Sequence, residues 1–314
     1  MFKIKLNISQ KIIINKNAEE VFKNLINFKD RIHWSPWFVL DKNVKIENLN
    51  QPAMIGHQQN FDSEIIGSGK MILTEIVQNK KIKCDLEFFK PWKSKSISEF
   101  NLIDLGNRTE VEWTMNSTAP FFVILFKKIL LSILGQDFNR GLVMLKSYVE
   151  TGRVLSDTQI QNVISNKSFY TVGFKHKSQL TDIGQLMTAD FNQLNLLVQD
   201  GALPMPKLAA GVYHKFDMIK NNTEFTSAFV YDADVAVPTD KNLIKKLVKD
   251  HSGFSVLHTG SYDHMGNGWS AAMGHVKHKK LKLNKSVDMY ELYLNNPSNS
   301  EIKNLKTQIV IPVK

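Results

Sequence analysis

The chain has 314 residues, a formal net charge of +10 and an apolar fraction of 43%. This composition excludes a disordered chain, and the length exceeds one typical domain, so we expect two domains with separate cores. The only cysteine, Cys84, cannot form an internal disulfide, and the first residues lack an apolar signal core. Both features favour a reducing cytoplasm, with Cys84 as a small buried side chain.

The positive charge comes from lysine, and the densest basic run covers residues 275–285. Apolar residues interleave with these lysines, and the run contains no glycine or aromatic residue. A solvated helix end is therefore favoured over a nucleic-acid-binding arm. No stretch has the pattern of a helix-turn-helix, so we do not expect direct nucleic-acid binding.

The N-terminal part begins with a strand and an amphipathic helix. Residues 10–15, with Ile12, Ile13 and Ile14, are expected to form a strand. Asn17 precedes Glu20 by three residues, which is typical of a helix cap. An apolar stripe at helical spacing follows, formed by Val21, Phe22, Leu25 and Phe28. After this helix, Trp34-Ser-Pro-Trp37 contains a proline that blocks helical continuation.

Short strands dominate the next part of the chain. They are expected at residues 57–66, 70–77, 81–89, 94–102 and 109–115, with turns at 67–69, 78–79, Pro91 and 106–107. Their alternation, as in Glu110-Val-Glu-Trp-Thr-Met115, predicts an antiparallel sheet with one face in water. Residues 121–150 then carry a long apolar stripe that includes Phe122, which predicts a buried helix covering the other face. Its lysines at 127 and 128 argue against a membrane span.

This order of elements resembles the polyketide cyclase and START-like superfamily, also called SRPBCC. The residues that carry the resemblance are Asn17-Ala-Glu-Glu-Val-Phe, Trp34-Ser-Pro-Trp37 and Gly135-Gln-Asp-Phe138. The resemblance implies a helix-grip domain over residues 1–155, with a cavity for apolar ligands between the sheet and the long helix. Trp34 and Trp37 are candidates to line the mouth of this second cavity, and packing within the loop is the alternative.

A polar stretch, residues 152–167, has no core pattern and marks the expected domain boundary near residue 155. Residues 156–314 then show a weak repeat. Strands at 169–176 and 253–260 each precede a helix, at 182–199 and 265–279, and the first helix is expected to start with Asp182 and Gln185 as a capping pair. Two strands follow each helix, at 210–216 and 225–237, and at 289–294 and 309–313. A duplicated β-α-β-β domain with a cleft between its halves is predicted.

The predicted strand at 289–294 carries a carboxylate between two tyrosines, in Tyr290-Glu-Leu-Tyr293. Alternate side chains of a strand share a face, so Glu291 and Tyr293 point the same way. The stretch Tyr290-Glu-Leu-Tyr-Leu-Asn-Asn-Pro297, followed by Ile309-Val-Ile-Pro-Val313, resembles the C-terminal signature of GyrI-like effector-binding domains, which also form the effector-binding halves of AraC-type activators. The resemblance implies a pocket role for Glu291. The alternative is a surface strand residue paired with lysine.

A sheltered carboxylate beside aromatic rings would receive a lipophilic cation, and Tyr213, Tyr262, Trp269 and Tyr293 are the candidate walls. The leading hypothesis is a two-domain α+β protein that binds an amphipathic small molecule, with cations among the candidates, for sensing or sequestration. Relatives also suggest hydrolysis with Glu291 and a tyrosine, a cyclase-like activity, or regulation of a protein partner such as gyrase. No cofactor is expected, and the histidines have no metal-binding spacing.

Overall fold

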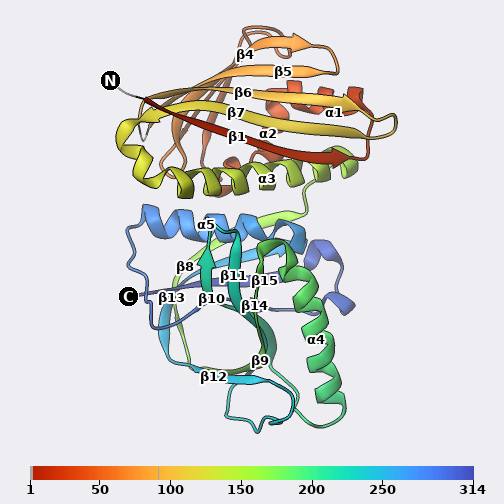
Figure 1. Cartoon of the computed structure of the whole chain (residues 1–314), viewed down its shortest axis with the longest axis vertical. Coiled ribbons are helices and arrows are strands. Elements are labelled where there is room, and N and C mark those ends of the chain that lie inside the picture. Colours follow the sequence, from red (N-terminus) through yellow and green to blue (C-terminus); the bar gives the residue numbers. More distant parts are fainter. Residues whose placement is uncertain (1–2, 91) are drawn as a thin grey trace. The chain divides into compact units, whose positions relative to one another are not determined.

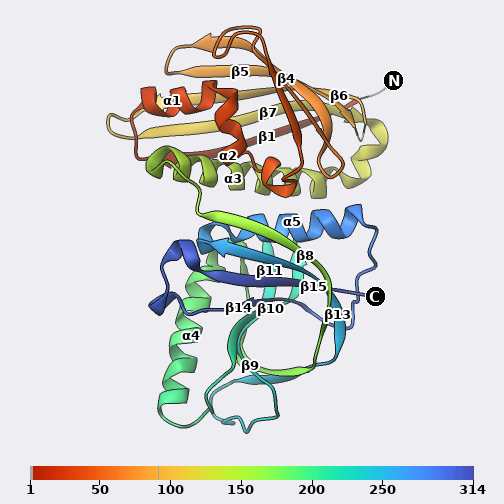
Figure 2. The same cartoon turned by 180° about the vertical axis from the view of Figure 1, so that it is seen from behind.

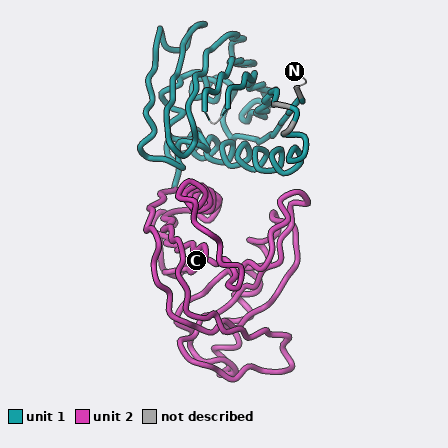
Figure 3. Tube along the Cα trace, turned by 90° about the vertical axis from the view of Figure 1, so that its left-hand side faces the viewer, with its two compact units in different colours: residues 1–155 teal, residues 156–314 magenta. Residues whose placement is uncertain are grey.

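The computed structural model describes residues 3–90 and 92–314. It consists of two compact units, Met1–Leu155 and Ser156–Lys314 (Figure 3). Each unit is built on one antiparallel sheet, and the first contains a long helix. The predicted α+β class is therefore confirmed, and the first unit is consistent with a helix-grip arrangement. Across the described residues, no helix has the length and apolar character needed to cross a membrane.

Seven strands form the sheet of the first unit, in the order β1-β7-β6-β5-β4-β3-β2 (Figure 1). They are β1 (Lys3–Ile14), β2 (Lys45–Leu49), β3 (Gln58–Ser63), β4 (Gly67–Val77), β5 (Lys81–Lys90), β6 (Ser94–Asp104) and β7 (Thr109–Pro120). The alternation predicted in β7 is present, because Val111, Trp113 and Met115 are buried whereas the residues between them are not. The short edge strand β2 was not predicted.

Three helices cover one face of this sheet (Figure 2). They are α1 (Ala18–Ile26), α2 (Arg31–Trp34) and α3 (Lys127–Thr151), with 3₁₀ turns η1 (Phe28–Asp30), η2 (Phe38–Leu40) and η3 (Phe121–Phe126). Asn17 caps α1 as predicted, since its Oδ1 accepts from the Glu20 amide at 2.9 Å.

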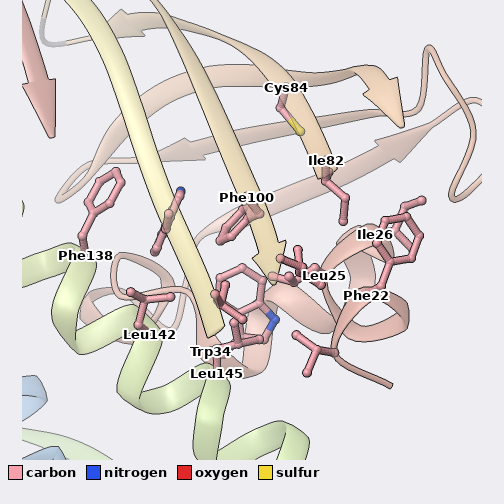
Figure 4. Close-up of a cluster of buried hydrophobic side chains, with 14 of the residues drawn as sticks. Phe22, Leu25, Ile26, Trp34, Ile82, Cys84, Phe100, Phe138, Leu142 and Leu145 are labelled. Carbon is pink, nitrogen blue, oxygen red and sulfur yellow. The ribbon is translucent and has the colours of Figure 1, made fainter. Parts of the chain in front are cut away.

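The core of the first unit lies between α3 and the sheet. Figure 4 shows Phe138, Leu142 and Leu145 of α3 pointing toward Trp34 and Phe100. Cys84 is buried in the same cluster, as expected. The predicted turn at Pro91 and the Phe122 side chain lie outside the described residues, as does the very start of the chain.

The prediction that residues 121–150 form one buried helix is wrong for its first half. The α-helix begins only at Lys127, and Phe121, Leu125 and Phe126 are exposed. The inner side of this segment contacts a small second cluster through Val123 and Leu131. The segment is apolar on both sides, and only one side packs on the sheet, so an apolar run alone did not indicate which residues become buried.

Eight strands form the sheet of the second unit, in the order β12-β9-β11-β10-β14-β15-β13-β8. They are β8 (Ser156–Asn166), β9 (Phe169–Gln179), β10 (Leu208–Asp217), β11 (Asn222–Tyr231), β12 (Ile244–Val248), β13 (His251–Gly260), β14 (Met289–Tyr293) and β15 (Lys306–Val313). Helices α4 (Ile183–Gln199) and α5 (Met265–His278) follow β9 and β13, with turns η4 (Leu180–Asp182), η5 (Tyr262–His264), η6 (Pro297–Asn299) and η7 (Ile302–Asn304). The predicted pairing of the last two strands is present.

Three predictions for this unit need correction. The polar stretch 152–167, for which no strand was predicted, is mostly the strand β8, which pairs with β13 at the sheet edge and therefore needs few apolar residues. Asp182 makes no side-chain capping hydrogen bond to α4, because it is the last residue of the 3₁₀ turn η4 in a helical conformation and its carboxylate accepts from Thr181 instead. The strand expected over residues 225–237 ends at Tyr231, and β12 was not predicted.

Candidate functional site

Glu291 lies at the centre of the second sheet. Its strand β14 runs between β10 and β15, where Glu291 is opposite Gly211 on one side and Ile309 on the other. Strand alternation turns Glu291 toward the face that also receives side chains from α4 and α5. The carboxylate is only 2% exposed. A charged group so deep in a fold requires hydrogen-bond partners.

Three neutral donors meet this carboxylate. The Trp269 indole Nε1 donates to Oε1, and the Tyr293 hydroxyl donates to Oε2 at 2.8 Å. The Tyr213 hydroxyl forms a third hydrogen bond with the carboxyl group. The sequence-predicted position of Tyr293 on the same face as Glu291 is thereby confirmed. No lysine, arginine or histidine pairs with Glu291 among the described residues.

Aromatic rings enclose the donors. Tyr213 lies edge-on to Trp269 with ring centroids 5.1 Å apart, and Phe216 packs against both rings. Tyr262 lies edge-on to Tyr293 at 5.6 Å and is 38% exposed. The four tyrosine and tryptophan candidates from the sequence are therefore brought together around Glu291, with Tyr262 on the outer side.

Burial governs the electrostatics of the site. It raises the pKa of Glu291, and the three donated hydrogen bonds oppose this rise without cancelling it. Burial and the neighbouring carboxyl group raise the pKa of Tyr213 and of Tyr293 well above the usual value. Both phenols therefore remain neutral donors. The result is an acidic group that is fully hydrogen-bonded but lacks a compensating positive charge.

Small side chains make room for this arrangement. A Cβ on Gly211, opposite Glu291, would lie 2.7 Å from Cε of Met187 and 3.2 Å from the Tyr293 hydroxyl. Met187 comes from α4, and its sulfur lies 3.3 Å from the Tyr293 hydroxyl, whose single proton is donated to Glu291. Glycine at this position thus lets α4 contribute a flexible methionine beside the carboxylate.

The two tryptophans expected near a cavity in the first unit pack in its core. Trp34 is fully buried, with its ring 6.0 Å from that of Trp113. Trp37 contacts Trp113 at 5.7 Å and Phe138 at 5.8 Å. Their role as a cavity mouth stays a prediction.

A second buried carboxylate was missed. Asp190 of α4 accepts from the Ser227 hydroxyl at 2.6 Å and contacts His176 Nε2 at 2.8 Å. The serine bonds to the aspartate and not to the histidine, which is not the order that activates a serine nucleophile. Asp190 stands between Met187 and Leu194 on the buried side of α4, so a carboxylate within an apolar helical stripe was the available signal.

Another polar cluster, also missed, joins strands of the second sheet. His214 Nδ1 contacts Asp288 at 2.7 Å, and Lys246 pairs with the same carboxylate. Burial disfavours the charged form of Asp288, but hydrogen bonds and charge from His214 and Lys246 lower its pKa to about 2. This cluster is an internally neutralised ion pair, in contrast to Glu291. Within residues 3–90 and 92–314, no group of three histidine, cysteine or acidic side chains is placed to hold a metal ion.

The family comparison concerns the second unit. The family model of the GyrI-like small molecule binding domain matches residues 165–314. A search of curated protein sequences finds no significant match.

Several solved structures resemble parts of the chain. The C-terminal domain of EcmrR is 17% identical, with a TM-score of 0.41, and the match covers 51% of this chain and 99% of that domain. SAV2435 bound to tetraphenylphosphonium is 13% identical, with a TM-score of 0.39, covering 50% of this chain and 94% of that one. The Aha1 protein from Colwellia psychrerythraea is 19% identical, with a TM-score of 0.35, covering 48% and 99%. By the family match, residues 165–314 form a GyrI-like small-molecule binding domain.

Proposed function

We propose that the second unit binds a lipophilic organic cation at Glu291, for sensing or sequestration of that compound. The observation that supports the proposal is a 98% buried carboxyl group with three neutral donors and no positive partner among the described residues. A bound cation would supply the missing charge. Attraction between charges is strong where water is excluded, so the site would favour a cation over a neutral molecule of the same shape.

The surrounding rings suit a cation whose charge is covered by apolar groups. Trp269, Tyr213 and Tyr293 each present a ring near the carboxylate. A cation over such a ring gains about 0.5–2 kcal/mol. A small hydrated ion would lose its water without these contacts, so the aromatic walls favour a bulky organic ligand.

Binding at this site requires a side chain to move. Glu291 is covered by Trp269 and Tyr293, whereas Tyr262 is the most exposed of the four rings. We expect a ligand to enter past Tyr262 and to displace the Trp269 hydrogen bond, since Trp269 is on a different element from Glu291. Trp269 is the only tryptophan of residues 156–314, and its emission would change on binding.

The decisive experiment compares a charged and a neutral probe of similar shape. Tetraphenylphosphonium and neutral triphenylphosphine oxide are titrated into wild type, Glu291→Gln and Asp240→Asn, with Asp240 as an exposed control carboxylate. We expect the cation to stabilise wild type and the control by about 2.7 kcal/mol at a hundredfold excess over its dissociation constant. Glu291→Gln should lose this effect. Equal responses in all three proteins, or an equal response to the neutral probe, would contradict the proposal.

A hydrolase is the second candidate. The Tyr293 hydroxyl lies 2.8 Å from Glu291, which is hydrogen-bonding distance for a general acid and base pair. Incubating wild type and Glu291→Gln with strained electrophiles, such as epoxides, distinguishes the candidates. Turnover lost in the variant would favour hydrolysis, and binding without turnover would favour a receptor.

The finer fold assignments belong to the same proposal. The order of sheet and long helix supports a START-like first unit, and the strand order of the second unit supports a duplicated β-α-β-β motif in which β9, β10 and β11 correspond to β13, β14 and β15. In this scheme β10 and β14 are equivalent central strands, and Glu291 lies at their junction. We further propose that the protein is cytoplasmic and that a protein partner recognises its ligand-bound form.

A further inference from the structure

The first unit also contains a buried charge without a partner. Arg31 begins the short helix α2 and is only 8% exposed. Its Nη1 donates to Gln59 Oε1 and to Met71 Sδ, both at 3.0 Å. No carboxylate pairs with Arg31 among the described residues, and its Nε and Nη2 donate to no acceptor there.

A buried guanidinium without an acidic partner is costly. Most buried arginines are paired, because an isolated charge in the protein interior loses its hydration without compensation. Burial lowers the pKa of Arg31 to about 10, so the group is still positively charged at neutral pH. The nearby thiol supplies no negative charge, since burial raises the pKa of Cys84 to about 12. The surroundings therefore do not neutralise Arg31.

Gln59 holds the guanidinium in a fixed orientation. Its Nε2 donates to the Phe28 carbonyl at 2.9 Å and to Asn48 Oδ1 at 3.0 Å. With both amide hydrogens used, the Gln59 oxygen must face Arg31. One edge of the guanidinium is thus anchored by β3, and the Nε and Nη2 donors are left for another acceptor. Two adjacent donors in one plane match the two oxygens of a carboxylate.

A row of aromatic rings begins beside this charge. The guanidinium carbon is 5.7 Å from the Phe38 ring centroid. The Phe38 and Phe61 rings are 6.4 Å apart, and the Phe61 and Phe88 rings are 6.0 Å apart. Phe38 is buried, whereas Phe61 and Phe88 are half-buried, so the row connects the interior with the surface. Gly69 lies beneath it, where a Cβ would come within 2.7 Å of Phe61.

We propose that the first unit binds an anionic amphiphile, whose negatively charged carboxylate pairs with Arg31 and whose apolar tail lies along Phe38, Phe61 and Phe88. The guanidinium is oriented by Gln59, and its Nε and Nη2 donate to none of the described residues, which identifies the charge of the ligand. The row of rings identifies its apolar part. This site is separate from Glu291 in sequence and opposite to it in charge, so its test does not depend on the cation proposal.

The test uses dodecanoate below its micelle concentration, with dodecanol as a probe of equal length that lacks the charge and acetate as a probe that lacks the tail. Binding is measured by calorimetry on the full chain and by the shift of its melting temperature. We expect dodecanoate alone to bind wild type. Arg31→Met should weaken dodecanoate binding by about tenfold or more, because it removes charge-assisted hydrogen bonds. Lys45→Met, which removes an exposed lysine of the same unit, should have no effect.

A second variant guards against loss of folding in the first. Gln59→Glu places a carboxylate next to Arg31, within 3.0 Å of its Nη1 as Gln59 now is. We expect the new ion pair with Arg31 to abolish dodecanoate binding. It offsets the loss of the Nε2 hydrogen bonds to the Phe28 carbonyl and Asn48 Oδ1, so the unit should stay folded. Undiminished dodecanoate binding in Gln59→Glu, or equally tight binding of dodecanol to wild type, would overturn the proposal.

Discussion

The two units each bury a charged group of opposite sign, and they treat it differently. In the second unit, Glu291 accepts hydrogen bonds from three neutral side chains. In the first unit, Arg31 uses a single nitrogen for its hydrogen bonds to the protein. Both groups have aromatic neighbours, and neither has an oppositely charged partner among the described residues. Glu291 has hydrogen-bond partners but no opposite charge, whereas Arg31 lacks both an opposite charge and partners for two of its nitrogens.

The difference has consequences for stability and for binding. Removing Glu291 takes the acceptor from one buried donor, Tyr213, and from two half-buried donors, whereas removing Arg31 leaves only the Gln59 oxygen and a weakly accepting sulfur. A ligand at Glu291 must replace existing hydrogen bonds, while a ligand at Arg31 can use free donors. We therefore expect the cation site to contribute strongly to folding and the anion site to contribute little.

The largest expected effect is on the free energy of unfolding. Glu291→Leu should destabilise the second unit by about 3 kcal/mol or more, because each unsatisfied buried donor costs about 1–3 kcal/mol. Arg31→Met should change the stability of the first unit by less than about 1 kcal/mol, since loss of one hydrogen bond is offset by removal of a buried charge. Urea denaturation of both variants measures the two values. Equal destabilisation would show that the two charges play the same structural role.

A glycine lies beside each site, and replacing it by alanine should have a smaller effect on stability that differs between the two units. In Gly69→Ala, the new Cβ would lie 2.4 Å from the Glu87 carbonyl oxygen, which is backbone and cannot yield. In Gly211→Ala, the nearest atom is the end of the flexible Met187 side chain. We expect Gly69→Ala to cost about 1–3 kcal/mol and Gly211→Ala to cost less, because only the first forces a backbone shift. Thermal unfolding of the two variants tests the order, and a reversed order would contradict it.

The sequence predicted those parts of the fold that depend on local pattern. Asn17 and Glu20 indicated a cap, β7 showed its alternation, and Glu291 and Tyr293 were placed on one face by strand period alone. β8 escaped prediction, since an edge strand is stabilised by its neighbour β13 and not by its own apolar residues. Features set by residues close together in the sequence were predicted, whereas features set by residues far apart in the sequence were not.

The sites themselves show the same limit. Trp269 was proposed as an aromatic wall, but its hydrogen bond to Glu291 depends on how α5 packs on the sheet, which no local pattern encodes. Arg31 was not singled out, because an arginine after a helix is ordinarily exposed. Its burial results from β3 and β4, which bring Gln59 and Met71 to it from distant positions. Buried charges become recognisable only when long-range contacts are known.

The smallest effect concerns the pH dependence of binding, and it distinguishes the two charges without any mutation. The pKa of Glu291 is raised in the folded protein, so a proton competes with a bound cation below that pKa. Raising the pH from about 4.5 through the folded pKa should therefore increase cation affinity by up to about tenfold per unit, and the gain should level off once the carboxyl group is ionised.

The affinity of the anion site for dodecanoate, in contrast, should not depend on pH, so it serves as a control. The pKa of Arg31 is lowered only to about 10, so its charge is constant from about pH 6 to pH 8. Dodecanoate is itself ionised over this range, and its affinity should not change. Calorimetry of tetraphenylphosphonium and dodecanoate on the same protein gives both curves. A cation affinity that is flat from about pH 4.5 upward would mean that Glu291 is ionised throughout, and that its three donors outweigh its burial.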